Sequence, residues 1–291
     1  MASNRWVLGA RPRTLPAAIV PVAVGTAAAV GQADGGIIWW RAAAALVVSL
    51  TLQLATNFVN DYADGQRGTD DDRVGPVRLV ASGLATAKEV KTAAGIAFAV
   101  AGLAGTALAL AVGPELFVVG AASMLAGWAY TGGPRPYAYV GLGEVFVFVF
   151  FGLVATVGSA YVQTGQVTAL SVVASIPVGL LAVALLVINN LRDIPGDSVA
   201  NKFTLAVRFG DEKTRQIYVL LFALVGVAIA AAAAWRPLGL IGVVGLVAAV
   251  PPIRAVMAGD RGTALIPILG QTGRTQLLTG LLFAVGLSLG G

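Results

Sequence analysis

Two short runs of carboxylate and amide side chains carry the most distinctive chemistry in this chain of 291 residues. The first run follows a long apolar segment, and its polar residues are spaced i, i+3, i+4 and i+7. On a helix this spacing places two amides and two carboxylates on one face. The residues of this first motif are Asn57, Asn60, Asp61 and Asp64.

The second run follows another apolar segment and repeats the same chemistry. Asn189, Asp193 and Asp197 are spaced at successive i, i+4 intervals, so they also share a helical face. Carboxylates gathered from two helix ends repel one another, and divalent cations relieve that repulsion. Mg²⁺ prefers oxygen ligands and usually combines one or two carboxylates with substrate phosphates. The two motifs therefore predict a site that holds Mg²⁺ and a diphosphate.

Basic residues near the two motifs could complement the remaining phosphate charge. A single acidic run after an apolar helix is more often a solvated loop or a helix cap, and Asp71 and Asp72 fit that interpretation. Two runs in phase with the helix and on the same side favour a functional site, as membrane-edge acids generally do. The basic candidates are Arg67, Arg73, Arg78, Arg192 and Lys202.

The composition restricts the remaining chemistry. The chain has neither Cys nor His, which excludes disulfides, thiolate nucleophiles, imidazole bases and metal sites built on thiolate or imidazole ligands. Hydrophobic residues make up 57% and charged residues only 11%, far from the usual balance of a soluble domain. Although the net charge is +5, its placement indicates membrane topology, and no nucleic-acid partner is expected.

Apolar runs long enough to approach a bilayer crossing, which takes roughly 20 residues, recur along the whole chain. With the N-terminus in the cytoplasm, every Lys and Arg except Arg41 and Arg236 falls on the inner side, as the positive-inside rule requires. We therefore expect a single integral-membrane domain over residues 1–291, all-α, with nine transmembrane helices and the C-terminus outside. The nine runs are 14–31, 41–60, 92–112, 116–131, 140–161, 168–190, 216–235, 237–257 and 273–290.

Further candidates lie at the expected cytoplasmic ends of the spans. Tyr130, Arg135, Tyr137 and Tyr139 could bind substrate, and Glu144 could orient or deprotonate an acceptor hydroxyl. The plainer alternatives are an aromatic belt for the tyrosines, a topology signal for Arg135, and a first-turn acid for Glu144. Arg13 is either a substrate ligand or a topology signal.

An ordered set of motifs over nearly the whole chain resembles the UbiA superfamily of membrane prenyltransferases. Within it, the chain is most similar to the menaquinone-pathway branch that prenylates 1,4-dihydroxy-2-naphthoate. The matching stretches are residues 11–16 (RPRTLP), 60–64 (NDYAD), 68–70 (GTD), 75–78 (GPVR), 81–83 (ASG), 130–134 (YTGGP), 141–144 (GLGE), 190–193 (NLRD) with Asp197, and 202–208 (KFTLAVR).

The resemblance implies a helical bundle around a central cavity in a bacterial cell membrane. It also implies a polyprenyl diphosphate donor bound through Mg²⁺. Gly68 stands where the ubiquinone branch has a further Asp, and Asp70, two residues on, is what the naphthoate branch shows. Carried over by residue, the metal ligands are Asp61, Asp64, Asp70, Asp193 and Asp197, with Asn57 and Asn60 binding the donor.

The reaction expected from the resemblance is ionisation of the allylic C–O bond, followed by attack of the aromatic acceptor with loss of CO₂. No protein nucleophile is needed, which suits a chain without Cys or His. Two alternatives stay open. One is another acceptor, such as 4-hydroxybenzoate or homogentisate. The other is a secondary transporter or Mg²⁺ channel. A transport path would place polar groups near the membrane midplane, whereas the acidic residues here lie at helix ends on one side.

Overall fold

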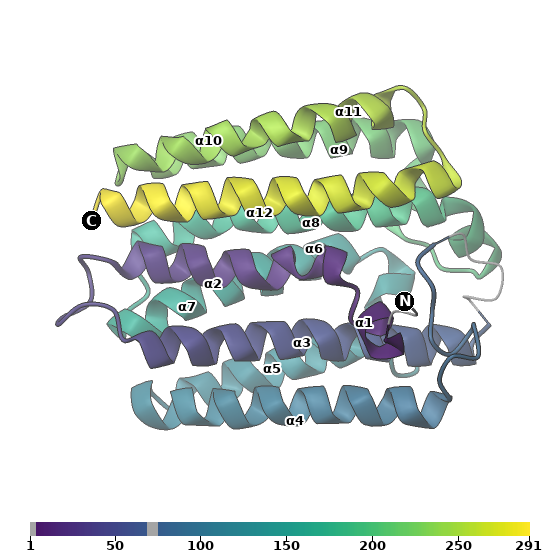
Figure 1. Cartoon of the computed structure of the whole chain (residues 1–291), viewed down its shortest axis with the longest axis horizontal. Helices are drawn as coiled ribbons and strands as arrows, with labels where there is room; N and C mark the ends of the chain where they lie inside the picture. The colour runs from purple at the N-terminus through teal and green to yellow at the C-terminus, as the bar shows by residue number, and fades with distance from the viewer. Residues whose placement is uncertain (1–3, 69–74) are drawn as a thin grey trace.

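The computed structural model describes residues 4–68 and 75–291, and the regular secondary structure within those residues is all helical. The principal helices lie side by side in one bundle (Figure 1). They are α1 (Arg5–Ala10), α2 (Pro16–Ala29), α3 (Trp39–Gln66), α4 (Ala87–Val112), α5 (Glu115–Ala129), α6 (Gly143–Val147), α7 (Ala155–Thr164), α8 (Ala169–Val199), α9 (Leu205–Ala232), α10 (Ile241–Gly245), α11 (Val250–Met257) and α12 (Leu265–Leu289).

Short 3-10 and π segments join or continue these helices. The segment η3 (Phe148–Val154) is π-helical and links α6 to α7 in one continuous run. The others are η1 (Pro12–Thr14), η2 (Tyr137–Val140), η4 (Pro237–Leu240), η5 (Leu246–Ala249) and η6 (Gly262–Ala264).

Among the residues that the structure describes, six helical runs are long and apolar enough to cross a membrane. They are Trp39–Gln66, Ala87–Val112, Gly143–Thr164, Ala169–Val199, Leu205–Ala232 and Pro237–Met257. Two more apolar helices, α2 and α5, are shorter, and α12 carries polar residues such as Gln271, Arg274 and Gln276 along its length. Each of the nine expected runs thus corresponds to a helical segment. Six of the nine have the length and hydropathy of a membrane span, and the count of nine stays a prediction.

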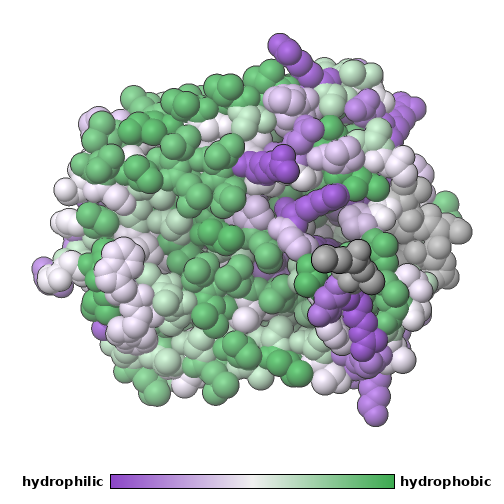
Figure 2. All heavy atoms as spheres, in the orientation of Figure 1, coloured by the Kyte–Doolittle hydropathy of each residue, from purple (hydrophilic) through white to green (hydrophobic). Residues whose placement is uncertain are grey.

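The surface supports a membrane-embedded bundle. Figure 2 shows apolar residues over most of one face, with hydrophilic residues gathered mainly toward one end. In the same orientation, Figure 1 places α1 and the chain's N-terminus at that end. This polar end is where the sequence predicts the substrate site.

Helix α8 is the centre of the bundle and the most buried of the candidate spans. It packs against α9, α12, α2 and η3, and its apolar side chains form much of the largest core cluster. Its contact with η3 depends on two glycines. A Cβ placed on Gly152 would lie 2.5 Å from the Cα of Gly179, so only glycine permits this approach.

Candidate active site

A cavity of about 640 Å³ lies inside the bundle. One end is lined by polar side chains, among them Arg11, Gln53, Asn57, Asn60 and Arg78. Apolar residues of α2, α3, α5 and α7 line the remainder, as far as Leu116 at the start of α5 and Val162 near the end of α7. The cavity can therefore hold a molecule with a polar head and a long apolar tail.

The first acidic motif is buried at the end of α3. Asn57, Asn60, Asp61 and Asp64 are between 0% and 8% exposed. The side-chain oxygen of Asn60 accepts a hydrogen bond from the Thr131 hydroxyl at 2.6 Å. An oxygen of Asp64 accepts one from the Tyr139 hydroxyl at 3.0 Å. Both contacts reach across to the segment that follows α5.

Asn57 belongs to a separate polar network one turn earlier. Its amide nitrogen donates to the Ala10 carbonyl at 3.0 Å and to the Thr14 hydroxyl at 3.3 Å. The amide nitrogen of Gln53 donates to the Asn57 side-chain oxygen at 3.2 Å. These bonds join α3 to the segment that leads into α2 and make a polar wall of the cavity.

Asp61 points toward a different partner from its neighbours in the motif. Its two carboxylate oxygens accept hydrogen bonds from the backbone amides of Leu79 at 2.8 Å and Val80 at 2.9 Å. The residue is fully buried. The predicted common face of α3 is thus divided between the cavity and the segment 75–83.

The second motif is buried at the end of α8, and each carboxylate there has a cation beside it. The Arg192 guanidinium donates to both oxygens of Asp193 at 2.8 Å and to Asn189 at 2.8 Å. The Lys202 ammonium lies 3.3 Å from an oxygen of Asp197. Buried carboxylates need such partners, because removing a charge from water is costly.

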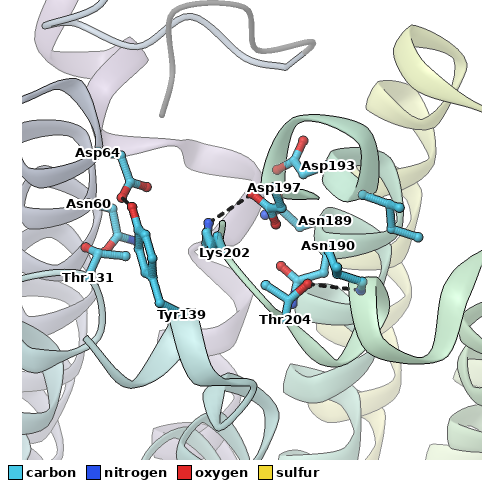
Figure 3. Close-up of polar contacts among 12 residues, drawn as sticks. Asn60, Asp64, Thr131, Tyr139, Asn189, Asn190, Asp193, Asp197, Lys202 and Thr204 are labelled. Carbon is cyan, nitrogen blue, oxygen red and sulfur yellow. Dashed lines mark hydrogen bonds and ion pairs between the residues drawn. The ribbon is translucent and has the colours of Figure 1, made fainter. Parts of the chain in front are cut away.

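Tyr139 and Lys202 lie between the two motifs (Figure 3). The Lys202 ammonium is 5.7 Å from the centre of the Tyr139 ring, and the Arg67 guanidinium is 5.3 Å from it. Asp64 is on one side of Lys202 and Asp193 and Asp197 are on the other, as Figure 3 shows. The structure therefore places the ends of α3 and α8 on either side of Tyr139 and Lys202.

The basic candidates have different surroundings. Arg67 donates to the carbonyls of Thr131 and Gly133 and so fixes the segment after α5. Arg78 is buried and lines the cavity. Arg13 is exposed, and its guanidinium donates to the Ile266 carbonyl at 3.3 Å. Arg135 is exposed. Arg73 and the proposed metal ligand Asp70 lie outside the described residues.

The aromatic candidates form part of the cavity wall. Tyr130 and Tyr137 meet edge to face, and Tyr137 stacks on Phe146 with ring centres 4.0 Å apart. All three line the cavity. Burial raises the pKa of the Tyr137 phenol above its ordinary value.

Glu144 is buried near the second motif, and its carboxylate accepts a hydrogen bond from the Asn190 amide at 2.9 Å. This contact joins the start of α6 to α8. It brings the predicted acceptor residue to the same end of the bundle as the carboxylates.

Sequence reasoning did not select Gln53, Thr131 or Phe146. A signal for Gln53 was available, because it lies four residues before Asn57 inside an otherwise apolar helix. Thr131 belongs to the matched stretch 130–134, although no role was predicted for it, and Phe146 carries no such signal. Their roles depend on the segment after α5 folding back against α3, which local spacing does not reveal.

The donor chemistry of the site fits a hard divalent cation. Carboxylate and amide oxygens from α3 and α8 are the ligands that Mg²⁺ prefers. Within residues 4–68 and 75–291, no three acidic side chains are close enough together to form a metal cluster. Each described carboxylate of the two motifs instead meets a hydrogen-bond donor or a cation of the chain itself.

Residues 18–265 match the UbiA prenyltransferase family. A relative from Mycobacterium tuberculosis, named 1,4-dihydroxy-2-naphthoate octaprenyltransferase, is 48% identical over 98% of this chain and 97% of its own length. A relative of the same name from Escherichia coli is 36% identical over 99% of this chain and 96% of its own.

Solved structures share the fold at low identity. A UbiA homolog from Archaeoglobus fulgidus bound to GPP and Mg²⁺ has a TM-score of 0.63 at 16% identity, covering 98% of this chain and 100% of that one. The apo structure of a UbiA homolog from Aeropyrum pernix has a TM-score of 0.72 at 14% identity, covering 94% and 96%. With the family match over most of its length, the chain belongs to the UbiA prenyltransferase family.

Proposed function

We propose that the protein transfers a polyprenyl group from polyprenyl diphosphate to 1,4-dihydroxy-2-naphthoate. The reaction releases diphosphate and CO₂ and gives demethylmenaquinol, the reduced hydroquinone form of demethylmenaquinone, in menaquinone biosynthesis. The observation that carries this proposal is the cavity, which joins amide side chains of the two motifs, those of Asn57, Asn60 and Asn189, to a long apolar interior. The naphthoate acceptor is supported by relatives of that name at 48% and 36% identity.

The donor diphosphate would bind at the ends of α3 and α8. Asn60 and Asp64 from one helix, and Asp193 and Asp197 from the other, would hold Mg²⁺. When bound, Mg²⁺ supplies charge neutralisation of the diphosphate and so assists its departure. Lys202 lies between the motifs. Its ammonium group is placed to exchange its ion pair with Asp197 for one with a phosphate oxygen of the donor.

The allylic part of the donor would lie against the aromatic wall formed by Tyr130, Tyr137, Phe146 and Phe150. Aromatic faces attract cations, so this wall suits an electron-poor allylic group. The apolar lining beyond it excludes water, which would otherwise capture the cation. No covalent attachment to the protein is required.

The acceptor would enter beside the same wall. Glu144, held by Asn190, is the proposed group that orients or deprotonates a ring hydroxyl. Arg13, Arg135 and Arg192 remain proposed ligands for the charged ends of the two substrates. Of these, Arg192 would have to exchange its bond to Asp193 for a bond to substrate.

We also propose nine spans in a bacterial plasma membrane, with the N-terminus in the cytoplasm and the C-terminus outside. All but two of the basic residues fall on the inner side of that topology. The polar end of the bundle seen in Figure 2 supports it. Membrane lipid would then surround the apolar face.

The test is an assay of the purified protein with octaprenyl diphosphate and Mg²⁺, offered 1,4-dihydroxy-2-naphthoate and 4-hydroxybenzoate in parallel. We expect a prenylated product and equal amounts of CO₂ only with the naphthoate. Turnover of 4-hydroxybenzoate alone would overturn the acceptor assignment. Mg²⁺ flux into liposomes without diphosphate release would instead favour the transporter alternative.

A further inference from the structure

We propose that Asp61 is a positioning residue and not a metal ligand. Its carboxylate fixes residues 75–83 against α3 and thereby places Arg78 at the polar end of the cavity, where Arg78 binds the donor diphosphate. The proposal rests on the proposed function for the identity of that ligand. It assigns Asp61 and Asp64 different roles, although the two belong to one sequence motif.

The first observation is the geometry of the Asp61 carboxylate. Both oxygens accept hydrogen bonds from consecutive backbone amides, those of Leu79 at 2.8 Å and Val80 at 2.9 Å. The residue is 0% exposed. A buried carboxylate is stabilised as an anion by two such N–H donors. These bonds direct both oxygens toward the backbone of the segment 75–83.

The second observation is the close packing of the same segment on α3. Leu79 is fully buried in a cluster with Phe58 of α3. A Cβ placed on Gly65 would lie 2.8 Å from the side chain of Val80, so glycine is needed for this approach. Asp61 and Gly65 are one turn apart, so they form one side of α3, and the segment lies against that side.

The third observation is the position that this anchoring gives to Arg78. Residues Gly75, Pro76, Val77 and Arg78 line the cavity, and Arg78 immediately precedes the first amide that Asp61 holds. Arg78 is 7% exposed. A guanidinium at the polar end of a cavity beside the carboxylate motifs suits a diphosphate, which it can bind through paired hydrogen bonds. The anchored backbone therefore sets the position of a phosphate-binding group.

The experiment compares Asp61→Asn with Asp64→Asn in the purified full chain. Asn can accept only one of the two amide bonds at this position. We expect amide hydrogen exchange of residues 79 and 80 to accelerate on the order of tenfold in Asp61→Asn and to stay unchanged in Asp64→Asn. Mn²⁺ binding, measured by electron paramagnetic resonance with a donor analogue at saturating concentration, should stay within about twofold for Asp61→Asn and fall at least about tenfold for Asp64→Asn.

Steady-state kinetics provide the functional readout. In Asp61→Asn, KM for the donor should rise on the order of tenfold with a smaller change in kcat, because ground-state phosphate binding is lost. Arg78→Gln should reproduce that change. The double variant should be no worse than the poorer single variant, since both act through one contact.

Gly65→Ala keeps the test decisive if Asp61→Asn does not fold. It leaves the Asp61 carboxylate intact but displaces Val80, so exchange at residues 79 and 80 and the donor KM should both rise. Loss of Mn²⁺ binding in Asp61→Asn equal to that in Asp64→Asn would overturn the proposal. Unchanged exchange at residues 79 and 80 would also overturn it. Amide exchange and Mn²⁺ binding are measured without turnover. A wrong acceptor assignment would therefore not change the expected result of either measurement.

Discussion

At the scale of single residues, the carboxylates of the two motifs differ in what they contact. Asp64 meets a hydroxyl, Asp193 an arginine, Asp197 a lysine and Asp61 two backbone amides. A hydroxyl or a lysine can be exchanged for an incoming metal–diphosphate, whereas consecutive backbone amides are fixed by the fold. The residues best placed to take part in substrate binding are therefore Asp64 and Asp197.

Asp64→Asn and Asp197→Asn should each lower kcat/KM by about 100-fold or more, because each removes a charged oxygen ligand. The Mg²⁺ concentration for half-maximal rate should rise in both. Asp34→Asn is the matched control, since Asp34 is exposed in the segment between α2 and α3. Activity within about twofold of wild type for either motif variant would contradict the assignment.

Tyr139 contributes a hydrogen bond and an aromatic face, and two substitutions separate them. Tyr139→Phe removes the bond to Asp64 but keeps the ring beside Arg67 and Lys202, so kcat/KM should fall about threefold to tenfold. Tyr139→Ala removes both the hydrogen bond and the ring, and it should lower kcat/KM by about a further tenfold. Equal losses in the two variants would show that the ring has no role of its own.

The sequence predicts the site residues more completely than their partners. Spacing alone shows that Asp61 and Asp64 lie near each other on α3, because the helical repeat fixes their relative angle. It does not show that residues 75–83 cover one of them. The bonds of Arg67 to carbonyls of residues 131 and 133 likewise depend on tertiary folding. Asp70, a predicted ligand, lies outside the described residues.

At the scale of elements, glycines bring the π-helical segment η3 close to the central helix α8. Gly152 and Gly179 meet backbone to backbone, and the aromatic residues just before Gly152 line the cavity. The expected runs 140–161 and 168–190 correspond to these helices, because long apolar stretches are the strongest sequence signal. The π geometry of η3 has no such signal.

Gly152→Ala should lower the melting temperature in detergent by several degrees, corresponding to about 1–3 kcal/mol, because the added Cβ meets backbone that cannot move freely. Gly102→Ala in α4 is the control. A Cβ there meets open space, so stability should be unchanged or slightly higher. Equal melting temperatures for Gly152→Ala and wild type would argue against this close contact.

At the scale of the whole molecule, the cavity extends from the polar end to the first turn of α5. Nine expected spans correspond to helical segments, but α2 and α5 are shorter than a full crossing and α12 is interrupted by polar residues. Hydropathy locates such helices in the sequence. It does not reveal the space that remains when they pack around one cavity.

The cavity makes a prediction about donor length. Gly120 of α5 lines it, and a side chain there meets open space. Gly120→Phe should reduce turnover of octaprenyl diphosphate by about tenfold or more and spare geranyl diphosphate, because the ring fills the path of the tail alone. Gly95→Phe, on an exposed surface of α4, should affect neither donor. Equal losses with both donors would contradict a tail lying past Gly120.

The central claim is that α3 and α8 jointly hold one metal–diphosphate headgroup. The most direct measurement is calorimetric binding of a non-hydrolysable prenyl thiodiphosphate, with and without Mg²⁺, to wild type, Asp64→Asn and Asp197→Asn. We expect tight binding to wild type only with Mg²⁺, and a loss of at least about tenfold in each variant. Equal affinity without Mg²⁺, or unchanged affinity in either variant, would contradict the claim.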